Sequence, residues 1–599
     1  MMKTYKYIGM VMMAAGVLAA TSCTDYADYN EAVADSNPAG DKTLWENLQQ
    51  NPNLSDFTAL VRKSGFSEQL NSASYYTVWA PVNGQFNKAE YEAMNQTDLL
   101  HKFVKNHIAE FSHSATGKLD DDNRVLMLNN KSYDFVGMGT YLFDNLTVEQ
   151  ANLPASNGLI HTLRGAAPFY PSLYEFVTDS VEAAKLGLDS LSAYFRSKET
   201  IYLDEQNSVK GPIVNGKVTY LDSVIIKRNS LTNRLNTQFE NEDSSYTFIL
   251  PTNSAWEKAY TAADTCYKYI ATTKAEKFVD QAGTISISAD PATKEINASE
   301  WRDSLAHSYL INYLTYSNND AYNKWLTSGA AVEDTLRTTR RTKLSGAADI
   351  LNAKVQTVNM SNGTGIVVND LNFRSWETYE PERTIRPYRN PEVARVLSGT
   401  ARREDVEHPD TSKVFVEEGT FSYVWVQAPS QYAKPELDLY LTDVKSTTYD
   451  FYCVFVPQNV ELGDTTTTLP NRVIFTLSYC DEAGELKTHE FLDESEENIN
   501  SFQERFNLKD NTSNRTTIRA FSNDTSKVDT LYLGEFTFPV CYYGLSDESK
   551  QEYICPNLKI TSPFSVFNAG MRAAFSRDFR IAAIILKPKK LVEYEKSNK

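Results

Sequence analysis

The chain holds few side chains at spacings that could carry out catalysis. The motifs G-x-S-x-G, G-x-x-x-x-G-K-[ST] and H-E-x-x-H, which mark serine nucleophiles, phosphate loops and zinc sites, are absent from its 599 residues. His101, His107 and His113 are spaced so that successive rings would lie about 120° apart on a helix. Rings in that arrangement share no face and are poor ligands for one metal ion. We therefore expect no enzyme, no metal site and no cofactor.

An acidic run begins like a calcium-binding loop but does not continue as one. An EF-hand loop counted from Asp120 needs Gly at its sixth position and Glu at its twelfth. Those positions hold Val125 and Lys131. We expect a solvated acidic loop here. Carboxylates are plentiful elsewhere, but the sequence does not show whether any two lie at the separation that a glycosidase needs.

Aromatic side chains are the feature with binding potential, because an amphipathic ring offers contact area at a low entropy cost. Trp79, Trp256 and Trp425 lie in strand motifs, so we expect them to belong to hydrophobic cores. Trp376 lies in the polar stretch 374–377 and is the better candidate for a ligand-binding residue at the surface.

A short repeated pattern suggests a covalent modification. Asp followed by Ser or Thr, and then by an aliphatic residue or Thr, resembles the O-glycosylation sequon that Bacteroidetes use on exported proteins. The candidate acceptors are Ser180, Ser190, Ser223, Ser304, Thr335, Thr465 and Thr530.

The N-terminus has the pattern of an export signal. Lys3 and Lys6 precede the apolar run 8–20, which is shorter than the ~20 residues that span a bilayer. The sequence A-T-S-C that ends at Cys23 resembles the lipobox of bacterial lipoproteins, in which the cysteine carries lipid. We expect a signal peptide over residues 1–22 and lipidation of Cys23. The alternative is an ordinary secretory signal that happens to contain a cysteine.

Residues 23–41 form a polar, acidic tether. An acidic stretch just after the lipidated cysteine resembles the surface-export signals of Bacteroidetes lipoproteins. The resemblance implies a lipid anchor in the outer membrane and a protein that faces the cell exterior.

Composition sets further bounds. A chain of 599 residues should hold several domains, and its net charge of −18 argues against a nucleic-acid partner, because phosphates demand basic patches. No two cysteines have C-x-x-C spacing, so we expect small buried side chains rather than a disulfide framework, although a bridge between Cys541 and Cys555 stays open. The cysteines besides Cys23 are Cys266, Cys453, Cys480, Cys541 and Cys555.

The first folded segment, residues 42–170, mixes helical and strand-like stretches. Its predicted elements are helices at 44–48, 57–61 and 99–104 and strands at 77–83 and 159–163. Pro81 should end the first strand, because proline has no N–H to donate to a neighbouring strand. Asn157 and Gly158 form a tight-turn pair that predicts a hairpin before the last strand.

These motifs, in this order, resemble a fasciclin (FAS1) domain. The family's first strand, T-V-F-A-P-T-N, is matched by residues 77–83, and its closing motif N-G-V-I-H-V by residues 157–162. The central Y-H pair of the family is matched only at His107, which follows Asn106. We expect the two motif histidines to fix a turn or a strand rather than to catalyse. The matching residues are Thr77, Val78, Trp79, Ala80, Pro81, Asn83, His107, Asn157, Gly158, Ile160 and His161.

The pattern repeats in residues 171–380, which we interpret as a second, divergent FAS1 domain. Residues 247–256 hold a second copy of the strand motif, and residues 361–368 correspond to the closing hairpin without its histidine. Insertions are expected near 204–241 and 261–299. The motif residues of this copy are Pro251, Thr252, Asn253, Asn362 and Gly363.

The last third of the chain is strand-rich. Residues 381–410 are charged and proline-rich and are predicted to be a linker. Alternating stretches in 411–599 predict a β-sandwich or jelly roll, with some likeness to carbohydrate-binding jelly rolls. The fold class is therefore α+β, with two FAS1-like domains followed by an all-β sandwich. The predicted strands are 421–427, 449–457, 472–480, 529–540 and 580–587.

The resemblance implies a non-catalytic lipoprotein on the outer surface of a Bacteroidetes cell, where the FAS1 domains act in adhesion or bind proteins. The alternative is an accessory lipoprotein that captures glycan or peptide beside a SusC/SusD-type TonB-dependent importer. An enzyme such as a glycosidase is the least favoured class.

The anchor can be tested directly. Cys23→Ala removes the sulfur that would carry the lipid, so we expect the variant to move from the membrane fraction to the soluble fraction. Fractionation of cells that express either form measures this. A variant that still sediments with membranes would show that another feature holds the protein there.

Overall fold

A computed structural model describes most of the chain. It covers residues 40–598 except for 121, 207, 215, 223–224, 269–276, 280–284, 288–297, 329, 332, 389–393, 408–419, 431, 442, 459–467, 484, 542–543, 548–551, 555 and 565–566. Cys23, Ser223, Thr465 and Cys555 therefore lie outside the described residues, as do the signal peptide and most of the tether.

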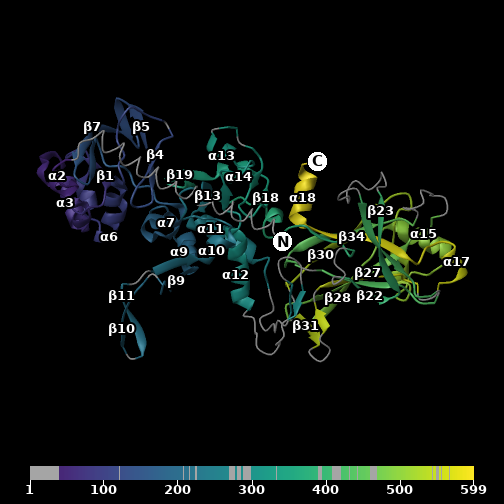
Figure 1. Cartoon of the computed structure of the whole chain (residues 1–599). Helices are drawn as coiled ribbons and strands as arrows, with labels where there is room; N and C mark the ends of the chain where they lie inside the picture. The colour runs from purple at the N-terminus through teal and green to yellow at the C-terminus, as the bar shows by residue number, and fades with distance from the viewer. Residues whose placement is uncertain are drawn as a thin grey trace, which may run out of the picture. The chain divides into compact units, whose positions relative to one another are not determined.

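The described chain divides into two compact units (Figure 1). The first unit ends at Glu182 and also contains 238–246 and 358–365. The second unit holds 183–237, 247–357 and 366–599. Helices and strands are mixed throughout, which agrees with the predicted α+β class.

One sheet dominates the first unit. Its strand order is β2-β1-β8-β7-β6-β5-β3, and β4 pairs with β5. β1 and β8 are parallel neighbours, with Trp79 opposite His161, whereas β7 and β8 form an antiparallel hairpin. The strands are β1 (Tyr76–Pro81), β2 (Ile108–Glu110), β3 (Lys118–Leu119), β4 (Arg124–Leu126), β5 (Ser132–Met138), β6 (Thr140–Phe143), β7 (Leu146–Ala155) and β8 (Gly158–Leu163).

Helices from before and after β1 pack their apolar side chains against it. Thr43 and Glu46 form a reciprocal capping box that starts α2, and α3 ends at Gly65, whose φ of 80° is left-handed. Phe57, Leu60 and Phe103 are buried in the same core as β1. The helices are α2 (Leu44–Gln50), η1 (Pro52–Leu54), α3 (Ser55–Ser64), α4 (Ser67–Leu70), α5 (Lys88–Glu92), α6 (Gln96–Asp98), η2 (Leu99–Val104) and η3 (Lys105–His107).

The hairpin before β8 differs from the predicted one by one residue. Its two-residue loop is Ser156 and Asn157, and Gly158 is already the first residue of β8. A Cβ on Gly158 would lie 1.9 Å from the carbonyl oxygen of Tyr76. The glycine is therefore needed for the close approach of β1 to β8, and not for the turn itself.

A second sheet has the order β16-β13-β20-β19. Its central strand begins at Tyr246, and a Cβ on Gly363 would lie 2.1 Å from the Tyr246 carbonyl oxygen, as at the first hairpin. The strands are β13 (Tyr246–Pro251), β16 (Thr315–Ser317), β19 (Lys354–Met360) and β20 (Gly363–Val368). The helices along this part of the chain are α7 (Leu173–Thr178), α8 (Ser180–Lys185), α9 (Asp189–Ser197), α10 (Ser230–Arg234), α11 (Asn253–Asp264), α12 (Ala298–Ile311), α13 (Trp325–Ser328), α14 (Ala347–Asn352) and η5 (Ser375–Glu377).

Small two-stranded sheets lie in or next to the predicted insertions 204–241 and 261–299, and a further one, over 336–344, lies outside them. β9 pairs with β12 and β10 with β11, so that residues 199–229 form a long ribbon whose β10–β11 end extends away from α9 in Figure 1. The strands of these small sheets are β9 (Glu199–Leu203), β10 (Val209–Val214), β11 (Lys217–Asp222), β12 (Ile225–Asn229), β14 (Lys277–Val279), β15 (Ile285–Ile287), β17 (Leu336–Arg337) and β18 (Lys343–Leu344).

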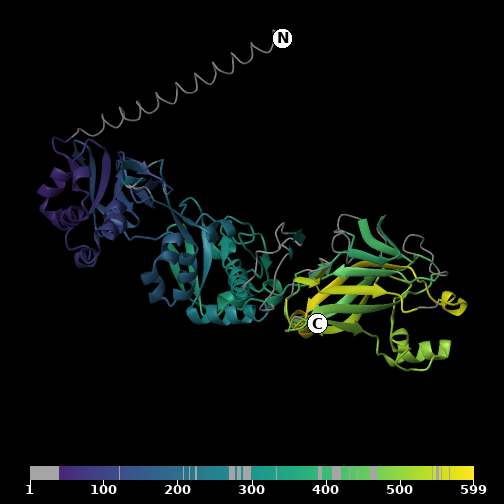
Figure 2. The same cartoon turned by 90° about the horizontal axis from the view of Figure 1, so that it is seen from below.

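The C-terminal part is a sandwich of two sheets, as predicted (Figure 2). One sheet has the order β23-β24-β34-β26-β30 with β21 paired to β34, and the other has the order β22-β25-β33-β27-β28 with β29 paired to β27. A single apolar core that includes Phe451, Phe475 and Ile581 takes side chains from both sheets.

The predicted strands of this part are confirmed as β24, β26, β27, β30 and β34, while its helices were not predicted. The strands are β21 (Arg383–Ile385), β22 (Ala394–Ser398), β23 (Thr400–Glu407), β24 (Thr420–Gln427), β25 (Glu436–Tyr440), β26 (Thr448–Phe455), β27 (Arg472–Cys480), β28 (Leu486–Phe491), β29 (Phe521–Ser522), β30 (Asp529–Thr537), β31 (Gly544–Asp547), β32 (Glu552–Ile554), β33 (Asn557–Thr561) and β34 (Phe579–Pro588). The helices are α15 (Glu496–Phe506), α16 (Arg515–Ile518), α17 (Ala569–Arg572) and α18 (Lys589–Ser597).

The stretch predicted as a linker, 381–410, differs from that prediction. It contains β21, β22 and β23, which pair with β34, β25 and β24. Five of the charged residues of this stretch, between 402 and 407, lie on β23, which is the end strand of its sheet. Charged side chains are typical of end strands, because they discourage pairing with another chain.

Within the second unit, the sandwich shares a buried, charged interface with helix α12 and with the residues that follow α11. The Lys445 ammonium lies 5.0 Å from the ring centre of Tyr267 and 5.4 Å from that of Tyr309 and bonds the Asp443 carboxylate. Glu380 is fully buried and accepts a hydrogen bond of 2.6 Å from Lys590. Burial works against the charged form of Lys445, but Asp443 outweighs it and keeps the pKa of Lys445 above its ordinary value.

The two close glycines give a stability prediction. Gly158→Ala places a methyl group against a backbone carbonyl, and we expect this to cost about 3 kcal/mol or more. Gly363→Ala should do the same at β20. Hydrogen exchange of the amides of β1 and β8, or of β13 and β20, measures the loss locally in this multidomain chain.

Gly570→Ala is the matched control, because the nearest atom to its added Cβ, Asn568 Oδ1, is 3.4 Å away and alanine favours a helix. Unchanged exchange in Gly158→Ala would contradict the close approach.

Candidate functional site

The first motif strand buries its large side chain at the centre of the sheet. Trp79 has no exposed surface, and its ring centre lies 4.8 Å from that of Phe143 and 5.4 Å from that of His161 in stacked geometry. Phe135 meets it edge-on at 5.5 Å. Trp79 is therefore a core residue, as expected, and cannot contact a ligand.

His107 joins a helix end to the chain that follows β8. Its Nδ1 donates to the Phe103 carbonyl at 2.8 Å, and its Nε2 accepts from the Ala167 N–H at 2.9 Å. The ring is fully buried, and this burial lowers the pKa of His107 to about 4 despite the bond to Phe103. A neutral ring with both nitrogens in use has no proton to exchange with a substrate.

His161 on β8 likewise bridges two backbone groups, but with the proton on the other ring nitrogen. Its Nε2 donates to the His113 carbonyl at 2.9 Å, and its Nδ1 accepts from the Asn152 N–H at 3.3 Å. Burial lowers its pKa to about 4. Both motif histidines thus bridge backbone groups that are distant in sequence.

Asn106, where the family has tyrosine, is also buried. Its Oδ1 accepts from the hydroxyl of Tyr133 at 2.7 Å and from the side-chain amide of Asn129 at 2.8 Å. The tyrosine ring beside His107 is thus replaced by an amide that binds a hydroxyl from β5. The sequence alone gave no signal for this contact.

The turn asparagine of each hairpin makes the same three bonds. Asn157 accepts from the Leu44 N–H at 2.8 Å and donates to the carbonyls of Leu70 and Ser72 at 3.0 and 2.7 Å. Asn362 accepts from the Leu173 N–H at 2.8 Å. It also donates to two carbonyls, those of Phe239 and Asn241, at 2.7 and 3.1 Å.

Other contacts recur in the same positions. Asn83, after the first motif strand, accepts from the Asp56 N–H at 2.9 Å, and Asn253, after the second, accepts from the Ser190 N–H at 2.9 Å. Thr252 caps α11 through its hydroxyl. Ser172 and Glu175 form a capping box like that of Thr43 and Glu46. The motif residues of both segments therefore support the fold and present no reactive group. Among them, Thr77, Val78, Ala80, Ile160, Pro251 and Asn362 are buried, and Pro81 is the last residue of β1, as predicted.

A pocket of about 630 Å³ lies in the first unit, beside η2 and α7. Apolar side chains of Tyr91, Met94 and Phe169 line it together with the carboxylates of Glu90 and Asp98 and those of Asp179 and Glu182. Its basic side chains are Lys102, which lies 3.5 Å from Asp179 and 3.6 Å from Asp98, and His101. The pocket is therefore both apolar and acidic.

An ion network forms the floor of this pocket. Lys131 has a side chain that is only 3% exposed and contacts Glu175 at 2.5 Å and Glu242 at 2.7 Å. His101 donates to the other oxygen of Glu175 at 2.8 Å. Burial would raise the pKa of Glu175, but the bonds from His101 and Lys131 lower it to about 2. The network stays charged and holds α7 in place.

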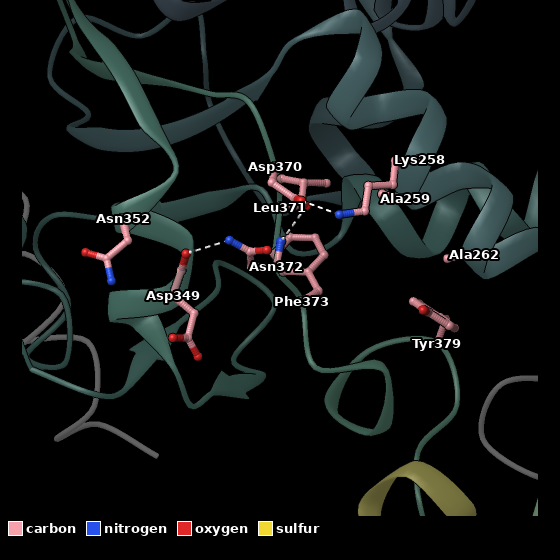
Figure 3. Close-up of a pocket in the computed structure, with 10 residues that line it drawn as sticks. All are labelled: Lys258, Ala259, Ala262, Asp349, Asn352, Asp370, Leu371, Asn372, Phe373 and Tyr379. Carbon is pink, nitrogen blue, oxygen red and sulfur yellow. Dashed lines mark hydrogen bonds and ion pairs between the residues drawn. The ribbon is translucent and has the colours of Figure 1, made fainter. Parts of the chain in front are cut away.

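A second pocket, of about 600 Å³, lies in the second unit (Figure 3). Lys258 on α11 pairs with Asp370, and Asn372 reaches across to the Asp349 carbonyl at 2.9 Å. Tyr379 is buried, which raises its pKa. Burial also favours a raised pKa for Asp370, but Lys258 and backbone N–H groups bring it below its ordinary value. The charged groups here satisfy each other, so the pocket can offer hydrogen bonds to a polar ligand but no obvious proton donor.

The remaining tryptophans divide as follows. Trp256 and Trp325 are buried, and Trp425 is partly exposed on the sandwich. Trp376 is partly buried, because its ring lies 5.0 Å from that of Tyr594 on α18. Its role in ligand binding stays a prediction.

The candidate glycosylation sites and cysteines can be placed where they are described. Ser180, Ser304 and Thr530 are exposed, and Ser190 and Thr335 are partly buried. Among the described residues, Cys266, Cys453, Cys480 and Cys541 are buried. Within the described ranges, no cluster of three or more metal-ligating side chains occurs, and no helix is long and apolar enough to cross a membrane.

The buried histidines give a pH prediction. In the unfolded chain their pKa returns to about 6.5, so the unfolded state binds more protons than the folded state between about pH 4 and 6.5. Stability is therefore complete above pH 6.5 and falls as the pH drops toward 4. We expect each of the two histidine rings to lower the free energy of unfolding at pH 5 by about 2 kcal/mol relative to its value above pH 6.5. Hydrogen exchange of the β8 amides in urea at pH 7 and pH 5 measures the loss.

His161→Gln should lower the stability of the domain at pH 7. It should also remove the part of the pH dependence of stability that the His161 ring contributes. His307→Gln is the control, because that ring lies in the second unit. An unchanged pH dependence in His161→Gln would show that this ring is not the titrating group.

Comparison with known proteins supports the motif analysis over the first segment. Residues 52–165 match the Fasciclin domain family. No curated protein matches the chain. The FAS1 domain pair of the insect cell adhesion molecule fasciclin I is 12% identical, with 55% of this chain and 99% of that chain covered and a TM-score of 0.18.

Two similar structures contain xylanase modules. One is the CBM22-1–GH10 part of xylanase 10B from Clostridium thermocellum, complexed with xylohexaose, at 11% identity, coverage of 35% of this chain and 28% of that chain, and a TM-score of 0.20. The other is the CBM22-1 xylan-binding domain of Paenibacillus barcinonensis Xyn10C, at 13% identity, coverage of 34% and 89%, and a TM-score of 0.16. Scores this low carry no argument about function. On the family match, residues 52–165 of this chain form a fasciclin (FAS1) domain.

Proposed function

We propose that the protein is a non-catalytic, lipid-anchored protein of the outer cell surface that binds other proteins through fasciclin domains. The observation that carries the proposal is the fasciclin match over 52–165 together with its buried motif side chains. Because those side chains maintain the fold, binding must use the surface around them. The lipobox at Cys23 and the acidic tether support the location.

We also propose that residues 171–380 form a second fasciclin domain. The support is the repeated set of contacts: a turn asparagine with three bonds, a glycine against the first strand, and an asparagine after that strand. Independent sequences rarely arrive at the same group of buried bonds at matching places, so duplication is the simplest origin.

The acidic pocket of the first unit is the surface best suited to a protein partner. Tyr91, Met94 and Phe169 offer apolar contact, and the exposed Glu90 carboxylate at the pocket forms no ion pair with any described residue. A basic segment with one apolar side chain would complement both features. We therefore propose a partner with such a segment.

Charge reversal tests this surface. Glu90→Lys should abolish retention of the partner, because a cation then meets the partner's cation. The full-length chain is immobilised, incubated with cell-envelope proteins of the source bacterium and washed, and the retained proteins are quantified by mass spectrometry. Glu68→Lys makes the same change on exposed helix α4 and should retain them. Equal retention of the partner by both variants would exclude this pocket as the surface that binds it.

The capture role beside a TonB-dependent importer is the alternative, and it would rest on the sandwich. The same experiment separates the two roles. Retention of a TonB-dependent porin that survives Glu90→Lys would favour capture, whereas retention of other surface proteins that is lost in Glu90→Lys favours the protein-binding role.

A further inference from the structure

Three side chains form a row across the outer face of one sandwich sheet. Arg402 on β23 is opposite Trp425 on β24, and Trp425 is opposite Arg580 on β34. Each guanidinium carbon lies 4.4 Å from the indole ring centre. The register of three antiparallel strands thus places two cations against one ring.

Arg580 is the unusual member of the row. It is only 6% exposed, and within the described part of the chain its guanidinium forms no hydrogen bond or ion pair. The Nε of Arg580 and the Nε1 of Trp425 are both buried donors without an acceptor. Buried donors are nearly always paired in folded proteins, and a buried cation without a counter-charge is costly.

The chain satisfies another buried arginine in the same sandwich completely. Arg472 is 4% exposed, and it donates to the Thr517 carbonyl at 3.2 Å, to Asn498 at 3.0 Å and to Ser522 at 3.2 Å. Arg580 differs in this from Arg472 and also from the buried Arg577, which donates to the Phe564 carbonyl at 2.6 Å. The lack of acceptors at Arg580 is the arrangement expected where a ligand supplies the acceptor.

The missing acceptor must carry negative charge and reach the sheet face. A carboxylate meets these needs, because its two oxygens match the parallel N–H groups of a guanidinium. Arg402 lies exposed beside the Trp425 ring and pairs with Glu404, two residues along β23. Its guanidinium can therefore bind the side of the ligand that faces solvent.

The rest of this face favours a sugar chain over an acidic peptide. Tyr452 and Tyr532 have ring centres 5.3 Å apart, and Tyr452 packs with Trp425 on the same apolar cluster. Tyr532 is 48% exposed, which leaves ring surface for the apolar face of a sugar. β24, which carries Trp425, has β23 and β34 on its two sides, so an extended peptide could pair only at the free edge of β23, away from the Trp425 ring.

We propose that this row, Arg402, Trp425 and Arg580, is a binding site for an acidic polysaccharide, with a uronate carboxylate bound by the arginines. The site goes beyond the proposed protein-binding role, because it lies on the sandwich and uses none of the residues of the acidic pocket. Loss of protein binding at the acidic pocket would therefore not affect this proposal, and the reverse also holds.

Calorimetric titration of the full-length chain tests the site. Polygalacturonate is the probe, dextran the neutral control, and polyglutamate and inorganic phosphate report on acidic peptides and on simple anions. We expect polygalacturonate alone to bind. Arg580→Gln should weaken it at least tenfold, and Arg402→Gln, at an exposed position that cannot disturb the core, severalfold.

Arg403→Gln is the matched control. It changes the neighbouring arginine on β23, which points to the opposite side of the strand and pairs with Asp405, and it should bind like the wild type. Thermal unfolding shows whether Arg580→Gln is folded, and Arg402→Gln decides the question if it is not. No binding of polygalacturonate, equal binding of polyglutamate or phosphate, or equal loss in Arg403→Gln would each overturn the proposal.

Discussion

The parallel pairing of β1 with β8 is the constraint on which the fasciclin domain depends. A parallel pair needs a long connection, and here residues 82–157, which hold the helices after β1 and strands β2 to β7, lie between the two paired strands. Gly158 lets the two backbones approach, and Asn157 ties the hairpin to helices α2 and α4. His161 then bonds β8 to the His113 carbonyl of that connection, and His107 bonds the connection to Ala167 beyond β8. Each of these motif positions thus requires its particular residue type, because that residue bonds or contacts segments that are distant in sequence.

Much of the fold follows from local patterns. Strands such as β1, β13, β26 and β34 were predicted because β-branched and aromatic residues cluster there, and α2 because its apolar residues have helical spacing. The hairpin turn was placed one residue late, because Asn-Gly is a strong turn signal and Gly158 serves another purpose. The strands of 383–407 were missed because the charges of an end strand look like those of a linker.

Contacts that join distant strands could not be predicted. The bond between Tyr133 and Asn106 has no spacing rule, since their elements pack only in the folded sheet. The row through Trp425 requires the register of three strands, two of which are more than 150 residues apart in the chain. Sequence reasoning placed Trp425 in a core, and the ring is in fact partly exposed between two arginines. The two pockets likewise combine side chains from several elements.

The buried interface around Lys445 bears on how this chain could have been assembled in evolution. A domain that recombines freely between genes carries a surface that is stable in water by itself. The sandwich does not end in such a surface, because its Lys445 is covered by Tyr267 and Tyr309, and Lys590 reaches the buried Glu380. Transfer of the sandwich alone would expose these groups or leave charges unpaired. Residues 247–380 and the sandwich are therefore expected to be inherited as one cassette, with substitutions on one side matched by substitutions on the other.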